Sequence, residues 1–364
     1  MANKKLKIGV LFGGKSAEHD VSLQSAKNVI GALDKNKYEV IPIGIDKKGK
    51  WILGSASNYF LNEKKLKLTK SNEKNREVAL YAQGEGVLTD IENSKNQKKI
   101  DVVFPVMHGP FGEDGSIQGL LKLAGVPFVG AGVLGSAVGM DKDVMKRLLR
   151  DAGIPIGKFI ALKQGEKISF ENIKKELGMP MFIKPANMGS SVGINKAKNK
   201  KEFEQAVKEA FLYDTKIVVE EFIDGRELAV AVLGNERPIA SGLCEVLTDR
   251  KFYDYEAKYS DENGAVIQIP AELSEKLISQ AQSIAIATYK ALECEGMARI
   301  DLFLQKGSNK FIVCEINTIP GFTSHSMYPK LWEASGVPQS KLLDKLISLA
   351  MERFKKEQKL KSTV

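Results

Sequence analysis

Two strand-like segments near the C-terminus, residues 299–303 and 313–317, restrict the fold of this chain more than any other feature. The residues between them at 307–309 are Gly, Ser and Asn, which are typical of a hairpin loop. We therefore expect the two segments to pair as antiparallel strands. Because side chains alternate between the two faces of a strand, the register of this ribbon decides which residues meet.

A turn centred on Ser308 places Asp301 directly opposite Glu315. The same register places Arg299 opposite Asn317 on the same face, with the β-carbons of each pair about 4.5–5.5 Å apart. Opposed carboxylates repel, so a cation is expected between them, and carboxylate and amide oxygens suit Mg²⁺. The guanidinium of Arg299 then suits a carboxylate, oxyanion or phosphate. The alternative is a surface hairpin with ordinary polar residues.

The first 130 residues alternate between strand-like and helix-like segments. A strand at 7–12 runs into a glycine-rich turn, a helix follows at 21–33, and further strands are expected at 38–45 and 101–107. Such alternation predicts a parallel sheet with ligands at the carboxyl ends of its strands. The lysine-rich stretch 60–100 carries no pattern that assigns an element to it.

From about residue 135 the pattern changes to α+β. The sequence predicts helices at 140–152, 274–292 and 341–355. Between them it predicts short strands at 181–185, 192–197, 216–223 and 228–234 and the long hairpin at 298–317.

Composition excludes several classes of protein. No apolar run in the 364 residues approaches the roughly 20 needed to span a bilayer, and the apolar part of the N-terminus is too short for a signal peptide. A cytoplasmic protein without a membrane partner is therefore expected. The three cysteines lack the spacing of metal ligands. The lysines and arginines behind the net charge of +9 are spread out and mixed with acidic residues, so nucleic-acid binding is not expected.

Two glycine motifs match nucleotide-binding patterns without the required context. Residues 9–16 fit the P-loop pattern, but residues 9–12 are themselves the apolar strand instead of part of a loop. Residues 130–135 fit G-x-G-x-x-G, yet the acidic residue about 20 positions further on, Asp151, ends a helix instead of a strand. A tight strand-to-helix turn explains the second motif equally well. A P-loop enzyme would depend on Lys15.

A better candidate for phosphate binding lies after the strand at 181–185. Lys184 ends this strand, and the loop at 187–193 offers hydroxyls and successive backbone N–H groups that can form an anion-binding nest. The apolar strand at 218–223 offers the slot and backbone edge that an adenine needs. A plain hairpin turn and a core strand are the respective alternatives.

These residues resemble the ATP-grasp superfamily and, within it, the D-alanine–D-alanine ligases, over nearly the whole chain. The matching motifs are GGKSAE at 13–18, HGPFGEDG at 108–115, MDK at 140–142, KP at 184–185, GSSVG at 189–193, YDYEAKY at 253–259, RID at 299–301 and EINTIPGFTSHS at 315–326.

The resemblance implies an ATP-grasp fold with a Rossmann-like parallel-sheet domain at 1–134, a small central domain at 135–226 and a C-terminal domain at 227–364. It implies that two D-alanines are joined at the expense of ATP through an acyl phosphate, for peptidoglycan synthesis. A homodimer is also implied. The hinge here, EEFI at 220–223, departs from the EKWL of some relatives, which leaves the side-chain contacts to adenine open.

The resemblance also implies a role for individual residues. Two magnesium ions, for which manganese can substitute, would be held by Asp301, Glu315 and Asn317. ATP would be bound by Lys142, Lys184, Ser191, Glu220, Glu221, Phe222, Ile223, Glu227, Phe252, Lys258, Phe303 and Glu315. The two D-alanines would contact Glu18, His108, Arg299, Gly321, Ser326 and Met327. The catalytic set would be Glu18, Ser190, Tyr259, Arg299, Gly321 and Ser326, with Arg299 and the Gly321 N–H as the oxyanion hole.

The segment 245–261 is long enough to be a lid. The resemblance implies that this lid closes over ATP, that Lys258 reaches a phosphate, and that Tyr259 bonds with Ser190 and Glu18. A surface loop is the alternative. Two rival functions stay open: a D-alanine–D-lactate ligase of the same superfamily, and a non-catalytic nucleotide-binding protein on the same fold.

Overall fold

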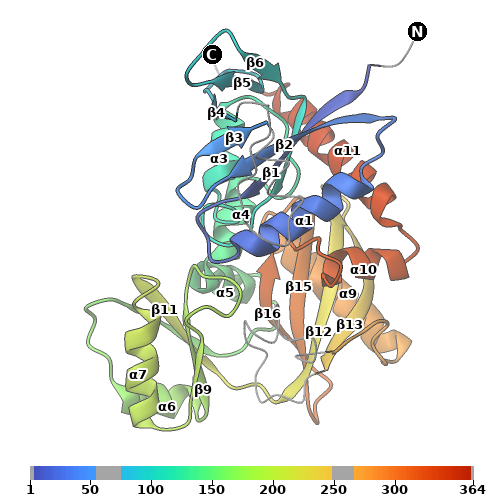
Figure 1. The fold of residues 1–364 in the computed structure, drawn as a ribbon. Coiled ribbons are helices and arrows are strands. Elements are labelled where there is room, and N and C mark those ends of the chain that lie inside the picture. Colours follow the sequence, from blue (N-terminus) through green and yellow to red (C-terminus); the bar gives the residue numbers. More distant parts are fainter. Residues whose placement is uncertain (1–3, 55–74, 248–265, 362–364) are drawn as a thin grey trace.

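The fold contains three sheets in a computed structural model that describes residues 4–54, 75–247 and 266–361 (Figure 1). Their strand orders are β6-β5-β4-β3-β2-β1-β7, β10-β9-β11-β8 and β14-β13-β12-β15-β16. The predicted combination of α/β and α+β parts is confirmed. No helix of the described ranges combines the length and apolarity that crossing a membrane requires.

The first sheet is parallel at one end and antiparallel over the rest. Its strands are β1 (Leu6–Gly13), β2 (Tyr38–Ile45), β3 (Trp51–Leu53), β4 (Arg76–Leu80), β5 (Val87–Asp90), β6 (Gln97–Lys99) and β7 (Val102–Val106). β1 pairs in parallel with β2 and β7, whereas β2 through β6 pair antiparallel. The prediction of a parallel sheet is therefore right only for the strands β2, β1 and β7 at one end of the sheet.

The chain itself explains this mixture. The helix α1 (His19–Ala32) connects β1 to β2 and allows a parallel crossover. Between β2 and β3 only a tight turn is present, in which the Gly49 N–H and the Lys50 carbonyl both bond to Asp46. A connection this short forces antiparallel pairing. The unassigned stretch 60–100 accordingly contributes short antiparallel strands in its described part.

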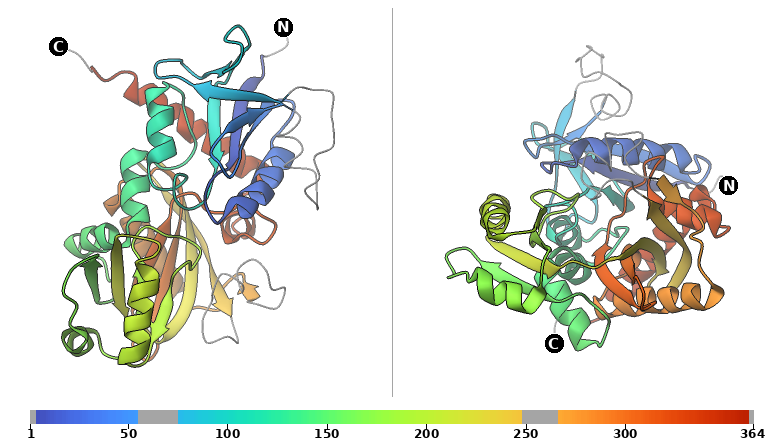
Figure 2. Two further views of the ribbon diagram at one scale, coloured as in Figure 1. Left: turned by 60° about the vertical axis from the view of Figure 1, so that its left-hand side comes forward. Right: turned by 90° about the horizontal axis from the view of Figure 1, so that it is seen from below.

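The second sheet, with two helices on it, forms a separate lobe. Its strands are β8 (Phe159–Lys163), β9 (Met181–Pro185), β10 (Asn195–Ala197) and β11 (Lys216–Glu221). The helices α6 (Phe170–Leu177) and α7 (Lys200–Ala210) complete it. Its core lies entirely between Leu162 and Val219. The lobe stands at the lower left of Figure 1 and at the left of the right-hand view of Figure 2.

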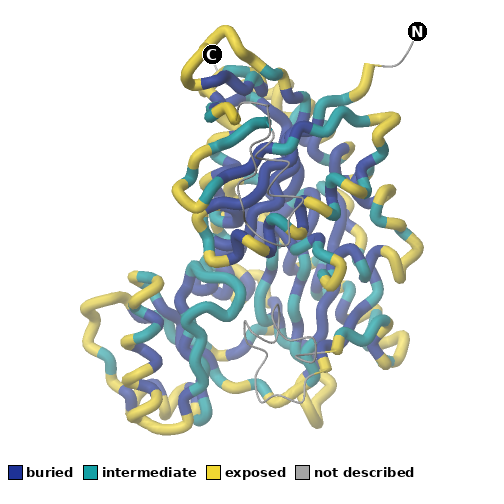
Figure 3. The backbone as a smooth tube through the Cα atoms, in the orientation of Figure 1, coloured by how far each residue is buried: buried dark blue, intermediate teal, exposed yellow. Residues whose placement is uncertain are grey.

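The third sheet carries the hairpin. Its strands are β12 (Gly225–Gly234), β13 (Ile239–Leu247), β14 (Val266–Gln268), β15 (Gly296–Gln305) and β16 (Phe311–Asn317). The remaining helices are α3 (Ser116–Leu123), α4 (Val133–Met140), α5 (Lys142–Asp151), α9 (Glu275–Ala291), α10 (Met327–Ala334) and α11 (Gln339–Glu357). One core joins β1, α1 and β7 to β12, α10 and α11, so the first and third sheets share their packing (Figure 3).

The helix predicted at 140–152 is present as α5, which begins two residues later at Lys142. α4 ends at Met140, and Asp141 between the two helices is extended with φ −82° and ψ 102°. The Asp141 carboxylate caps α5 by accepting from the N–H groups of Asp143 and Val144. A carboxylate cap of this kind stabilises a helix start, and it fixes Lys142 as the first residue of α5.

Candidate active site

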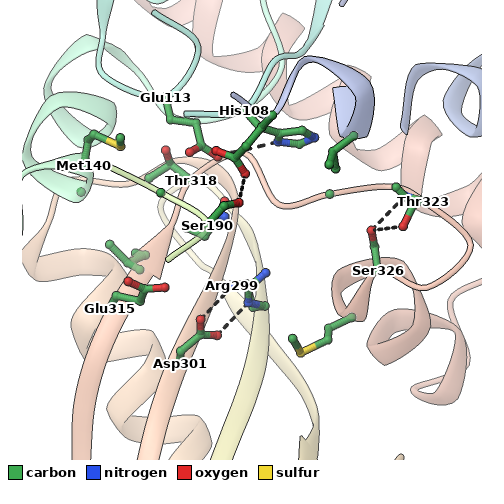
Figure 4. A pocket seen from close by; sticks show the side chains of 18 of the residues that line it. His108, Glu113, Met140, Ser190, Arg299, Asp301, Glu315, Thr318, Thr323 and Ser326 are labelled. Atoms are coloured by element: carbon green, nitrogen blue, oxygen red, sulfur yellow. Dashed lines mark hydrogen bonds and ion pairs between the residues drawn. The ribbon is translucent and has the colours of Figure 1, made fainter. Parts of the chain in front are cut away.

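A cavity of roughly 710 Å³ lies where the three sheets meet. Its lining comes from the start of α1, the segment after β7, the start of α5, the loop after β9, the hairpin β15–β16 and the segment that leads into α10. Figure 4 shows side chains from these elements pointing toward one another. Residues predicted from distant motifs therefore share one space.

The predicted pairing of the hairpin is confirmed. Asp301 lies opposite Glu315, and Arg299 lies opposite Asn317. Nearer the tip the register differs by one residue, because Leu302 pairs with Val313. Cys314 is an extra residue on β16, a β-bulge that accounts for this one-residue difference. Because of the bulge, Glu315 pairs with Asp301 and lies on the same face of the ribbon.

The charge on Asp301 is balanced by its neighbour on the strand. Arg299 Nε and Nη2 each donate to Asp301, with both distances 2.7 Å. The Asn317 Oδ1 accepts from the N–H of Ile319 at 3.1 Å. No cluster of three His, Cys, Asp or Glu occurs in the described part of the chain. The oxygen donors that the hairpin gathers on one face are the carboxylates of Asp301 and Glu315 and the Asn317 amide. Such hard oxygen donors fit Mg²⁺.

Glu18 links two parts of the molecule instead of capping α1. It precedes the helix but makes no side-chain cap hydrogen bond. Its carboxylate accepts from the Ser190 hydroxyl, which comes from the loop after β9. A β-carbon on Gly109 would stand 2.8 Å from Glu18 Oε2, and one on Gly189 would stand 3.0 Å from it. Both glycines therefore allow the backbone to approach this carboxylate closely.

His108 is buried beside the same carboxylate. Its Nδ1 lies 3.0 Å from the Ile319 carbonyl, and its Nε2 lies 3.3 Å from the Ser25 hydroxyl. Burial alone would lower the pKa of His108, but Glu113, whose Oε1 lies 3.8 Å from Nδ1, and Glu18 raise that pKa overall. A cationic imidazole can donate from both nitrogens, which fits these contacts.

The residues predicted for the phosphates lie around the loop after β9. Lys142 Nζ donates to the carbonyl of Met188 at 2.6 Å. Ser190 and Ser191 have φ values of 49° and 60°. Two consecutive residues in this left-handed region are uncommon, and they give the loop a tight curve. Lys184 Nζ donates to Glu220 at 2.8 Å, so this lysine is paired with a carboxylate.

The predicted adenine edge begins where β11 ends. Glu221 is its last residue, and Glu221 Oε1 accepts from the N–H of Lys158. The N–H groups of Phe222 and Ile223 have no acceptor within the described residues, so they stay available to a ligand. None of the residues 220–223 lines the cavity described above, which instead reaches Glu227. Glu227 lies directly opposite Phe303 in the pairing of β12 with β15.

The far end of the cavity is formed by the segment before α10. A β-carbon on Gly321 would stand 2.7 Å from the Ser326 hydroxyl oxygen. That oxygen accepts from the Thr323 N–H at 2.9 Å and lies 2.8 Å from the Thr323 hydroxyl. Met327 follows as the first residue of α10 and also lines the cavity.

Two models of a known family match the chain. The model described as "D-ala D-ala ligase N-terminus" matches residues 7–131, and "D-ala D-ala ligase C-terminus" matches residues 148–348. The chain belongs to the D-alanine–D-alanine ligase family. A curated D-alanine–D-alanine ligase from Oceanobacillus iheyensis is 52% identical over 362 residues, 99% of each chain.

Two solved structures of ligases share this fold. The VanG D-Ala:D-Ser ligase from Enterococcus faecalis has a TM-score of 0.84 and 38% identity, and the match covers 95% of this chain and 100% of the other. A D-alanine–D-alanine ligase from Bacillus anthracis complexed with ATP has a TM-score of 0.72 and 29% identity, covering 97% and 99%. The expected ATP-grasp architecture of the ligase family is thus confirmed.

Sequence reasoning missed several residues of the ligase site. Lys330, Gln24 and His325 also line the cavity. Their positions depend on how α1 and α10 pack, which no local motif encodes. Three predicted residues, Phe252, Lys258 and Tyr259, lie outside the described residues.

Proposed function

We propose that this enzyme joins two D-alanine molecules into D-alanyl-D-alanine, converting ATP to ADP and phosphate, for peptidoglycan precursor synthesis. The observation that carries the proposal is the single cavity that unites Glu18, the Arg299–Asp301 hairpin and the Gly321–Ser326 segment. These groups suit an amino-acid ammonium, a phosphoryl group and a second substrate, respectively. Because ATP is supplied in the cytoplasm, the reaction is assigned there.

The first D-alanine binds between Glu18 and His108. The Glu18 carboxylate pairs with its ammonium, while the buried His108, with its raised pKa, attracts its carboxylate. A carboxylate oxygen attacks the γ-phosphorus, the bond to the β-phosphate oxygen breaks, and an acyl phosphate and ADP result. Lys142 and Lys184 neutralise charge on the phosphates, with backbone N–H groups of the loop that carries Ser190 and Ser191 beside them.

The second D-alanine binds at Ser326 and Met327. Its amine attacks the acyl carbon, the carbonyl oxygen becomes an oxyanion, and phosphate leaves as the amine loses its proton. Arg299 and the N–H of Gly321 stabilise that oxyanion. The cation Lys330, which lines this end of the cavity, suits the carboxylate of the acceptor. Lys258 and Tyr259 keep their proposed roles in a lid that excludes water.

Asp301, Glu315 and Asn317 are the proposed ligands of two magnesium ions, or of manganese in their place. A bound divalent ion supplies neutralisation of phosphate charge. The proposal is supported by the register that gathers two carboxylates and an amide on one face. When Asp301 holds an ion, the Arg299 guanidinium gives up its bidentate contact with Asp301 and contacts the reacting groups instead.

We also propose a homodimer and three domains. Leu120, Leu123 and Leu134 are exposed on α3 and α4 and suit a contact between copies of the chain. The domain limits proposed from the sequence, 1–134, 135–226 and 227–364, are kept with two refinements. Because Met145 and Leu149 of α5 share a core with β12 and β15, the separate lobe begins only near Ile156. Because β12 starts at Gly225, the second boundary belongs between Glu221 and Gly225.

Product analysis tests the function. The purified enzyme with ATP and magnesium is offered D-alanine, L-alanine, or D-alanine together with D-lactate or D-serine. We expect ADP release with D-alanine alone and D-alanyl-D-alanine as the main product in both competitions. Asp301→Ala should abolish turnover without unfolding the protein. Equal turnover with L-alanine, a depsipeptide product, or an active Asp301→Ala variant would each contradict the corresponding part of the proposal.

A further inference from the structure

Lys146 is a buried cation that the proposed reaction does not use. It lies one turn after Lys142 on the same face of α5, and its side chain is only 2% exposed. Its ammonium lies 3.3 Å from Glu220 Oε1 and 5.8 Å from the centroid of the Phe159 ring. Unlike Lys142, Lys146 does not line the cavity, so its contacts indicate a role exerted through Glu220.

Glu220 has two lysines on one carboxylate. Its Oε2 accepts from Lys184 at 2.8 Å, and its Oε1, near Lys146, accepts no hydrogen bond within the described residues. Burial alone would raise the pKa of Glu220, but Lys146 and Lys184 lower it to about 2. The carboxylate is therefore ionised in an interior where an isolated charge is strongly unfavourable.

The two lysines differ in exposure and position. The Lys184 side chain is 13% exposed at the end of β9, where the phosphate loop begins, whereas the Lys146 side chain on α5 is 2% exposed. A triphosphate bound at that loop would attract Lys184 away from Glu220. Without a second cation, that movement would leave a buried carboxylate unpaired, which is costly.

We propose that Lys146 is a positioning residue, the permanent counter-ion of Glu220 that leaves Lys184 free to move to the phosphates of ATP. The inference rests on the proposed use of ATP by Lys184. A positioning role for Lys146 differs from that of a purely structural ion pair in one respect. Once the charge of Glu220 is removed, Lys146 should no longer be needed for nucleotide binding.

A double-mutant cycle tests this difference. Full-length Lys146→Met, Glu220→Gln and the double variant are titrated with ATP and magnesium by calorimetry without D-alanine, and the KM for ATP and kcat are measured separately. We expect Lys146→Met to weaken ATP binding at least tenfold. The double variant should bind ATP within threefold of Glu220→Gln alone, because Gln needs no counter-ion. Lys98→Met, which breaks an exposed pair with Glu39, controls for the lost charge and should bind normally.

Each outcome decides the inference. Wild-type affinity in Lys146→Met overturns it, as does a double variant that binds ATP more than threefold more weakly than Glu220→Gln. Should Lys146→Met fail to fold, this second comparison still decides the inference. A wild-type protein that binds no ATP would instead refute the proposed function itself.

Discussion

Replacing Gly321 by alanine should disable the oxyanion hole by a steric route that can be worked out from distances. The added methyl would stand 2.7 Å from the Ser326 hydroxyl oxygen, about 0.7 Å closer than the 3.4 Å at which ordinary contact begins. Ser326 cannot simply rotate away, because its oxygen is held by the Thr323 N–H and lies 2.8 Å from the Thr323 hydroxyl. Either these two hydrogen bonds break or the backbone at residue 321 moves.

Both alternatives have an estimated size. Two hydrogen bonds contribute about 1–3 kcal/mol. For 364 residues the entropy of unfolding is about 0.8 kcal/mol per degree, so Tm should fall by about 1–4 °C. Displacing the Gly321 N–H from the developing oxyanion should lower kcat/KM by about 10²–10³-fold, the usual effect of losing one such donor.

Steady-state kinetics and thermal unfolding together test this reasoning. Gly31→Ala is the matched control, since nothing lies within 4 Å of the added methyl and alanine favours the helix α1. In a Ser326→Ala background the clashing oxygen is gone. The double variant Gly321→Ala/Ser326→Ala should therefore have the same Tm as Ser326→Ala alone. Wild-type kcat/KM and Tm in Gly321→Ala would refute the steric argument.

Two further predictions concern buried charges. Glu113→Gln should lower the pKa of His108 in an NMR titration. In the wild type this pKa stands above the unfolded value of about 6.5, so protonated His108 stabilises the fold at low pH and this stabilisation is lost as the pH rises. The variant should therefore lose more stability at pH 6 than at pH 9. A pKa that does not fall would contradict the assigned partner. Arg353→Met should lower the free energy of unfolding by about 2–6 kcal/mol, because the carbonyls of Phe128 and Gly130 lose a buried hydrogen-bond donor. The kcat/KM at 25 °C should stay unchanged, and an unshifted Tm would refute the prediction.

The hairpin illustrates how far sequence reasoning reached. The facing pairs follow from strand periodicity and were predicted correctly, yet the tip of the hairpin has a register shorter by one residue. Periodicity contains no signal for the bulge at Cys314, which depends on packing against neighbouring strands. Likewise the sequence predicted that opposed acids need a cation, but it did not indicate that Arg299 would satisfy Asp301 from two residues away.

Other features were beyond local patterns because they depend on tertiary packing. The helix α4 was missed, because the sequence predicted a helix only from residue 140, where α4 ends and the Asp141 cap starts α5. Lys146 looked like an ordinary helix lysine, and only the proximity of α5 to β11 makes it a buried partner of Glu220. The antiparallel strands β4 to β6 are short and polar, so their periodicity is weak.

The separate core of the lobe built on the second sheet has a topological consequence. The chain leaves the body of the molecule near Ile156, which bridges to Val313, and re-enters it with β12 at Gly225. What remains on either side packs into one interior. The lobe is thus an insertion between two halves of a single discontinuous folding unit. A fragment that ends at residue 226 would contain β1, α1 and β7 without the core residues of β12, α10 and α11 that pack against them.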